Sequence, residues 1–275
     1  MSPLELDALA ALVPDGATLA LPPDNSLPPS ALVRALVRAG KTGLHLIGVP
    51  VSGYASDLLI GAGCVASIQT SGVTLGEAGM APRFTAALAA GSIRVIDATC
   101  PAMHTMLQAA EKGVPFMPLR GVIGSDILAH RPDWKVIDNP FASGGDPIVL
   151  LPALNPDIAI FHAAMADLDG NVYVGRRREL ATIAHASKRV LVTVERITEN
   201  NLLEDENLAP GTINGAYIEA VAVVERGAWP IGLLDIHPFD AAHFADYARM
   251  ARTDEGFRQY LAQYVFNSAQ MAAAE

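Results

Sequence analysis

A single carboxylate, Glu77, sits in a glycine-punctuated stretch whose composition suits a catalytic loop. Gly72, Gly76 and Gly79 let the backbone turn where a side chain would clash. Such a loop exposes backbone N–H groups that bind an oxyanion, and a carboxylate beside them can attack a carbonyl carbon or activate water. The stretch therefore predicts a reactive carboxylate. The structural alternative is that Glu77 caps the following helix or pairs with Arg83.

The elements around this loop follow a strand, loop, helix, strand order. Residues 65–70 alternate as a pleated segment does, which favours a strand over a helix. A helix is expected over 82–91, because a proline opens it and a glycine ends it. Phe84 and Leu88, four residues apart, give that helix an apolar face. The chain is expected to return to a buried strand over 93–100.

The same alternation of strands and helices runs along most of the chain. Residues 30–40 predict a helix with an apolar buried stripe, and Arg34 and Arg38 are expected on its opposite side. This rhythm is typical of parallel strand–helix–strand units, so we expect an α/β fold with a largely parallel sheet flanked by helices. Since no internal repeat or linker divides the sequence, one domain over 1–275 is predicted. Its final segment, 240–275, is expected to be helical.

The overall composition indicates a protein that buries surface against a partner. The chain has 275 residues, of which 51% are hydrophobic and 17% charged, and its mean hydropathy is +0.29. These values favour an extensive subunit interface. The net charge of −10 argues against binding to the nucleic-acid backbone, which requires clustered Lys and Arg, and offers no attraction to anionic membranes.

The sequence also bears on location. No apolar run reaches the roughly 18 residues that a spanning helix needs, and the first residues lack the basic region of a signal peptide. The two cysteines, Cys64 and Cys100, lie in apolar contexts and are expected to be buried thiols rather than a disulfide. A cytoplasmic protein is therefore predicted.

Several segments together resemble the α subunits of family I CoA-transferases, such as the α-type chain of glutaconate CoA-transferase, and the related acyl-CoA hydrolase subunits. The first segment contains the Glu77 loop: it reads GAGCV, then LGEAG, then APRF, which opens the short helix that ends at Gly91. The resemblance covers roughly Pro14 to Gly227. Three later runs continue it in order: Pro115–Asp126 (PFMPLRGVIGSD), Leu154–Val172 (LNPDIAIFHAAMADLDGNV) and Ala184–Ile197 (AHASKRVLVTVERI).

The resemblance implies the CoA-transferase fold and an enzyme that moves CoA between an acyl-CoA and a carboxylic acid. It implies a β subunit of similar fold as partner, in a heterodimer or heterotetramer, with the CoA thioester as substrate and no permanently bound cofactor or metal. In such two-subunit transferases the nucleophilic glutamate belongs to the β subunit, in a Ser-Glu-Asn-Gly-like loop. The nearest match here, Thr198–Asn201, lacks the glycine.

Two alternatives stay open. In the hydrolase relatives the α-type chain supplies the working acid, which would make this chain an acyl-CoA hydrolase subunit, ring-cleaving or thioester-cleaving, that uses Glu77. A further alternative is a non-catalytic scaffold subunit that completes the partner's site. Burial and pairing of Glu77 far from any cleft would favour the scaffold.

The resemblance places several loop positions near the substrate. Arg120 is a candidate for binding a substrate carboxylate bidentately, or alternatively for a salt bridge to Asp126 or to the partner. One departure from the family is the loop PPDNSLPP after the first strand, where prolines replace glycines and cannot donate N–H bonds. The candidate substrate-binding residues are Ser52, Gly53, Ser71, Gly76, Gly79 and Arg120, and the candidate catalytic residue is Glu77.

The histidines support two interpretations each. Asp235, His237, Asp240 and His243 are spaced as metal ligands can be, but Asp240 also suits the cap of the last helix. We favour the cap and predict no metal. His162 lies in an apolar strand, where a hydrogen-bonded core histidine is expected more often than one that faces a site.

Overall fold

The computed structural model describes residues 1–233 and 236–267. Its main element is a nine-stranded, mostly parallel sheet. Four strands follow one another from the middle of the sheet to one edge: β1 (Thr18–Leu21), β2 (Leu44–Gly48), β3 (Val65–Thr70) and β4 (Arg94–Asp97). On the other side of β1 lie β8 (Ile158–Asp167), β10 (Arg189–Thr198) and β12 (Ala220–Val223), also in parallel. Two short strands, β9 (Val172–Tyr173) and β11 (Thr212–Ile213), pair antiparallel beside the end of β8.

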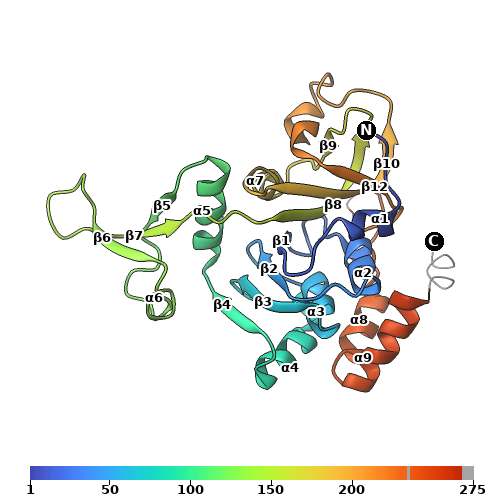
Figure 1. Cartoon of the computed structure of the whole chain (residues 1–275), viewed down its shortest axis with the longest axis horizontal. Helices are drawn as coiled ribbons and strands as arrows, with labels where there is room; N and C mark the ends of the chain where they lie inside the picture. The colour runs from blue at the N-terminus through green and yellow to red at the C-terminus, as the bar shows by residue number, and fades with distance from the viewer. Residues whose placement is uncertain (234–235, 268–275) are drawn as a thin grey trace.

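Helices cover both faces of this sheet, as the α/β prediction requires (Figure 1). One hydrophobic core lies under α1 (Leu6–Ala11), α2 (Ser30–Arg38), α3 (Tyr54–Gly61), α8 (Ala241–Met250) and α9 (Asp254–Leu261). The second core lies under α5 (Cys100–Glu111) and α7 (Arg178–Ala186). Alternate residues of a strand enter different cores, for example Leu19 and Ala20 of β1. The predicted fold class is confirmed.

The stretch around Glu77 forms the predicted order of elements. A 3₁₀ turn (Gly76–Ala78) follows β3, and α4 (Pro82–Ala90) leads into β4. Two details of the prediction were wrong. Leu88 is 53% exposed, because the face of α4 that packs inward carries Arg83 instead. The buried strand expected over 93–100 is not formed: β4 is at most half-buried, and Cys100 is the exposed first residue of α5.

Other segments also differ from expectation. Arg34 is buried, because Trp229 from a distant segment covers it: its guanidinium lies 5.2 Å from the indole centroid and donates to the Trp229 carbonyl. The segment after β2 forms α3 over residues 54–61. The two cysteines are free thiols, as predicted, and Cys64 is the buried one.

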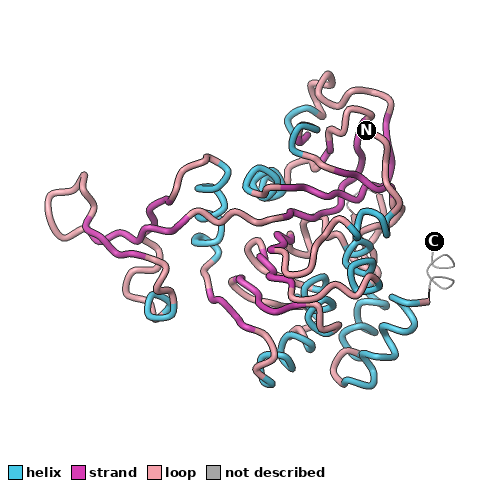
Figure 2. Tube along the Cα trace, viewed as in Figure 1, coloured by secondary structure: helices cyan, strands magenta, loops and turns pink. Residues whose placement is uncertain are grey.

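A second, three-stranded antiparallel sheet stands away from the main body, at the left of Figure 1 and Figure 2. We call it the projecting sheet; its strand order is β5 (Phe116–Leu119), β7 (Pro147–Pro152), β6 (Lys135–Asp138). The short helix α6 (Ile127–His130) lies between β5 and β6 in the chain. Val136, Ile137 and Phe141 are all exposed, and Phe141 is 97% exposed.

The expected helical C-terminus is present over the described part. Asp240 caps α8 by accepting the His243 N–H at 2.9 Å, which confirms the capping interpretation. A π-helical turn (Ala262–Phe266) follows α9, and residues 268–275 of the predicted helical segment lie outside the described residues. That 1–275 form one domain stays a prediction. Among the described residues, no helix combines the length and apolar character needed to cross a bilayer.

Candidate functional site

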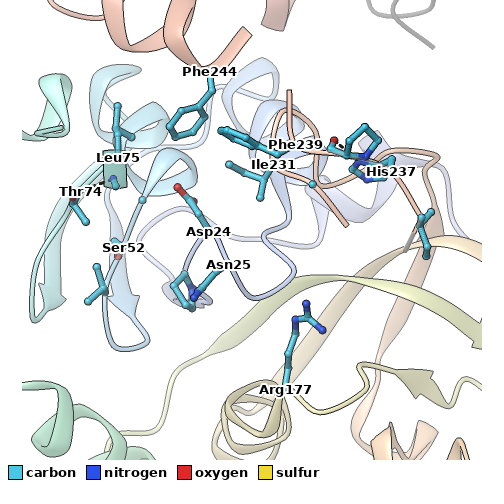
Figure 3. Close-up of a pocket in the computed structure, with 17 residues that line it drawn as sticks. Asp24, Asn25, Ser52, Thr74, Leu75, Arg177, Ile231, His237, Phe239 and Phe244 are labelled. Atoms are coloured by element: carbon cyan, nitrogen blue, oxygen red, sulfur yellow. Dashed lines mark hydrogen bonds between the residues drawn. The ribbon is translucent and has the colours of Figure 1, made fainter. Parts of the chain in front are cut away.

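A cavity of about 900 Å³ opens where three parallel strands end. The loops after β1, β2 and β3 each contribute part of its wall, as expected for a site at the carboxyl edge of an open α/β sheet. The opposite wall comes from the segment after β12 and from Phe244 of α8, and Arg177 reaches it from the start of α7 (Figure 3). The lining residues are Pro23, Asp24, Asn25, Val51, Ser52, Gly53, Thr74, Leu75, Gly76, Arg177, Ile231, Gly232, Ile236, His237, Pro238, Phe239 and Phe244.

The wall is mostly apolar with a few polar groups. Leu75, Ile231, Phe239 and Phe244 form a hydrophobic face in Figure 3, with Asp24 between them near the centre of the view. This composition is that of a small-molecule site, in which apolar surface holds the ligand and the polar groups orient it. The structure therefore supports a binding site for a ligand with an apolar body.

Asp24 is the carboxylate of this wall. Its two oxygens accept the Tyr54 N–H at 2.9 and 3.1 Å, at the N-terminus of α3. Burial raises the pKa of Asp24 to about 6 against the effect of this N–H bond, and nearby Asp57 adds to the rise. Gly53 is required here, because a Cβ on it would lie 2.1 Å from an Asp24 oxygen.

Ser52 is a buried hydroxyl of the same wall. Its Oγ has no hydrogen-bond partner among the described residues. The backbone around it is held firmly, since the Ser52 N–H donates to Gly72 at 2.9 Å and its carbonyl accepts the Thr74 N–H at 3.0 Å. Ser52 thereby joins the β2 loop to the loop that carries Glu77.

The Glu77 loop has the geometry that its glycines predict. Gly76 and Gly79 adopt φ of +60° and +96°, in the region that favours glycine. Thr74 braces the turn by accepting the Gly76 N–H at 3.1 Å. Glu77 itself is exposed, and Arg83, its partner in the structural alternative, binds Asp254 instead at 2.7 Å.

The sequence-predicted residues divide into two groups. Ser52, Gly53 and Gly76 line the cavity, and Glu77 follows Gly76 directly without lining it. Ser71 and Gly79 lie outside the lining; the Ser71 hydroxyl donates to the Pro50 carbonyl at 2.9 Å. Arg120 is on the projecting sheet, where it pairs with Asp146 rather than with the proposed Asp126.

Among the cavity residues that sequence reasoning missed, two are charged. Asp24 lies in the proline-rich loop, and the signal was an acidic residue directly after a buried strand. Arg177 is the middle of three consecutive arginines, and Figure 3 shows its side chain rising from the start of α7 toward the loop of Asn25. Its Nε is buried and has no hydrogen-bond partner within the described chain.

His237 links the cavity to a buried polar cluster. Its Nε2 lies 3.4 Å from Glu195, which also binds His162 at 2.8 Å and accepts the Arg226 N–H at 2.8 Å. His162 is thus a hydrogen-bonded core histidine, as its strand context favours. Within 1–233 and 236–267, no group of three or more potential ligands could hold a metal ion; Asp235 lies outside the described residues.

Comparison with known proteins gives the family. The family model for coenzyme A transferase matches residues 5–222. The A-type subunit of glutaconate CoA-transferase from Acidaminococcus fermentans is 30% identical over 279 residues, covering 95% of this chain and 86% of that protein. The crystal structure of that enzyme superposes with a TM-score of 0.89 at 28% identity, covering 97% and 89% of the two chains.

Two further relatives extend the comparison, and one of them has a named activity. The IpdA subunit of a cholesterol ring-cleaving hydrolase from Rhodococcus jostii is 32% identical over 249 residues, covering 87% of this chain and 83% of that one. An uncharacterised protein from Archaeoglobus fulgidus is 31% identical over 240 residues, and the match spans 85% of this chain but only 50% of that relative. The family match and the fold it shares with glutaconate CoA-transferase agree: this chain belongs to the coenzyme A transferase family.

Proposed function

We propose that this chain is the A-type subunit of a heteromeric enzyme that moves CoA between an acyl-CoA thioester and a carboxylic acid. The observation that carries the proposal is the apolar cavity at the carboxyl edge of the sheet, in a chain similar to one subunit of glutaconate CoA-transferase over nearly its whole length. Its volume of about 900 Å³ is ample for an acyl group.

Arg177 is the residue proposed to bind a carboxylate on the acyl group. A guanidinium pairs with a carboxylate bidentately, and no ion pair within the described residues occupies Arg177. Arg120 is less suited to this role, because Asp146 already pairs with it on the projecting sheet. The cavity thus has a cation at one side and the Asp24 carboxyl at the other.

A partner chain is proposed for two reasons. Asp24 is the one carboxylate among the described lining residues, and it is held against a helix N-terminus rather than presented as a nucleophile. The projecting sheet exposes Phe116, Val136 and Ile137, apolar groups that a second chain would cover. We therefore propose that a β subunit docks on the projecting sheet and brings the reacting glutamate.

Hydrolysis of an acyl-CoA is the second candidate, and the position of Glu77 favours it. Glu77 is exposed and directly follows Gly76 of the cavity wall, so it is not a buried structural carboxylate. The relative from a ring-cleaving hydrolase agrees with this alternative. Burial and pairing of Glu77 would favour the scaffold interpretation, and its exposure gives that interpretation no such support.

Thioester assays separate these functions. The chain is purified with the subunit that associates with it and given glutaryl-CoA with and without acetate as acceptor. Loss of glutaryl-CoA that depends on acetate and yields acetyl-CoA supports transfer, and loss without acetate that yields free CoA supports hydrolysis. Glutaryl-CoA and a panel of neutral acyl-CoAs all remaining intact would contradict both transfer and thioester hydrolysis.

A further inference from the structure

Asp24 has the geometry of a group that meets the ligand. The residue is half-buried and lines the cavity, and its carboxyl is fixed by the two bonds from the Tyr54 N–H. No ion pair of the described residues involves it. Gly53 has no side chain, and the Asp24 carboxyl fills the space that its Cβ would take. The loop after β1, which carries Asp24, therefore packs directly against the loop after β2, which carries Gly53.

Among the residues that the structure describes, no cation forms an ion pair with Asp24. Asp57 lies in α3, the helix whose Tyr54 N–H binds Asp24. Its carboxylate accepts the Tyr247 hydroxyl at 2.6 Å and the Phe84 N–H at 2.7 Å, and it does not line the cavity. The titratable and charged groups around Asp24 are Asp57 and Tyr54 of α3, Arg34 of α2, Arg177 and Glu179 at the start of α7, and His237 of the opposite wall.

We propose, on the basis of the function proposed above, that Asp24 exchanges a proton with the ligand: a carboxylate that enters the cavity is bound together with one proton, which Asp24 shares with it. Two carboxylates in one site cannot both stay ionised, so the second one to arrive raises the proton affinity of the pair. The shared proton then forms an O–H···O⁻ bond, which is among the stronger hydrogen bonds. Ser52 Oγ, which lacks a partner among the described residues, offers a second donor to the same ligand.

A pH effect of definite sign follows from this proton exchange. Protonated Asp24 donates to the incoming carboxylate, whereas ionised Asp24 repels it. Burial holds the pKa of Asp24 at about 6, so above that pH each ligand must bring a proton from solution. The affinity for a carboxylate should therefore fall roughly tenfold for each pH unit above this value.

Calorimetry tests the proton uptake directly. Glutarate is titrated into the chain, purified with its partner where one associates, at about pH 5 and about pH 8 in two buffers of different ionisation enthalpy. The expected result is uptake of about one proton per ligand at the higher pH and little at the lower. Glutaramide, which carries no charge, should bind without uptake, a control that needs no variant.

The variant Asp24→Asn keeps the shape and the acceptor for the Tyr54 N–H and adds a permanent donor. It should abolish proton uptake and bind glutarate with the same affinity at both pH values. Asp57→Asn is the matched control, because Asp57 has a raised pKa in the same region but does not line the cavity. That control should keep the uptake.

Three results would overturn the inference: equal uptake in wild type and Asp24→Asn, uptake lost in Asp57→Asn instead, or uptake with glutaramide. Acyl-CoA turnover without proton-linked glutarate binding would overturn this inference and leave the proposed function standing. Absence of turnover and of glutarate binding at either pH would overturn both.

Discussion

His162 Nε2 lies 2.8 Å from Glu195 Oε1, on neighbouring parallel strands β8 and β10 behind the cavity wall. Burial lowers the pKa of His162 despite the opposing effect of Glu195. Because a carboxylate can only accept, the bond is donated by the Nε2–H of His162. Thr193, opposite His162 in the strand register, binds the other ring nitrogen at 2.9 Å. Because Glu195 also faces His237, this pair supports the loop that forms one side of the cavity.

The first prediction concerns the stability contributed by Glu195. Glu195→Gln removes a charged acceptor from two hydrogen-bonded neighbours, His162 and the Arg226 N–H, and should lower the free energy of unfolding by about 1–3 kcal/mol. Burial opposes ionisation of Glu195, but His162 and the Arg226 N–H hold the pKa of its carboxyl below the usual value. The ionised carboxylate therefore stabilises the folded protein near neutral pH, and this stabilisation is lost as pH falls through the lowered pKa. Urea unfolding of the variant near neutral pH measures the change, with the exposed Glu199→Gln as control. Equal unfolding midpoints in both variants would contradict it.

The second prediction concerns the pH dependence of stability at Asp57. Burial raises its pKa to about 6 against the bonds from Tyr247 and Phe84. A carboxyl whose folded pKa is raised stabilises the protein fully at pH below its unfolded pKa, and this contribution is lost as pH rises through about 6. The loss is on the order of 2–3 kcal/mol. Asp57→Asn should therefore flatten the decline in unfolding free energy between about pH 4 and pH 7; an unchanged slope would be inconsistent with this assignment.

The third prediction concerns Glu77. Glu77→Gln keeps the shape of the side chain and removes its basicity, so hydrolysis of an acyl-CoA should fall by about 10²–10⁴-fold if Glu77 is the base. The thermal midpoint should not change, because the side chain is exposed. The exposed Glu204→Gln is the matched control. A decrease below about tenfold with an unchanged midpoint would remove Glu77 from the catalytic residues and leave the reacting carboxylate to the partner.

The fourth prediction compares two arginines. Arg177→Lys keeps the charge but loses the two-pronged geometry, so it should reduce kcat/KM for glutaryl-CoA more than for butyryl-CoA. Arg120→Lys, outside the cavity, should affect the two substrates equally. Steady-state kinetics with both thioesters gives the ratio. A selective effect of Arg120→Lys alone would return the substrate-carboxylate role to Arg120.

The fifth prediction concerns the projecting sheet. Replacing both Val136 and Ile137 by lysine places charges on an exposed apolar strand and should prevent association with the partner without unfolding the chain. Light scattering of the co-expressed subunits measures the assembly, and circular dichroism checks the fold. Leu168→Lys, an equally exposed apolar position on the main body, should leave the assembly intact. A well-behaved monomer with full activity in the wild type would refute the two-subunit proposal.

The sequence by itself determined the local elements. The alternation over 65–70, the proline that opens α4 and the glycine at 91 specify short-range structure, because strand pleat, helix start and helix end depend on residues close in the chain. Gly76 and Gly79 likewise adopt the left-handed φ that their spacing predicts. The α/β class followed from the order of these elements.

Only the tertiary structure decided which side chains meet. Arg34 is buried because Trp229, nearly two hundred residues later, lies over it, and Asp24 becomes a cavity carboxyl because α3 points its first N–H at the β1 loop. Arg177 reaches the same cavity from α7, and His162 meets Glu195 through the pairing of β8 with β10. Burial and the resulting pKa shifts come from these long-range contacts, which local sequence patterns do not encode.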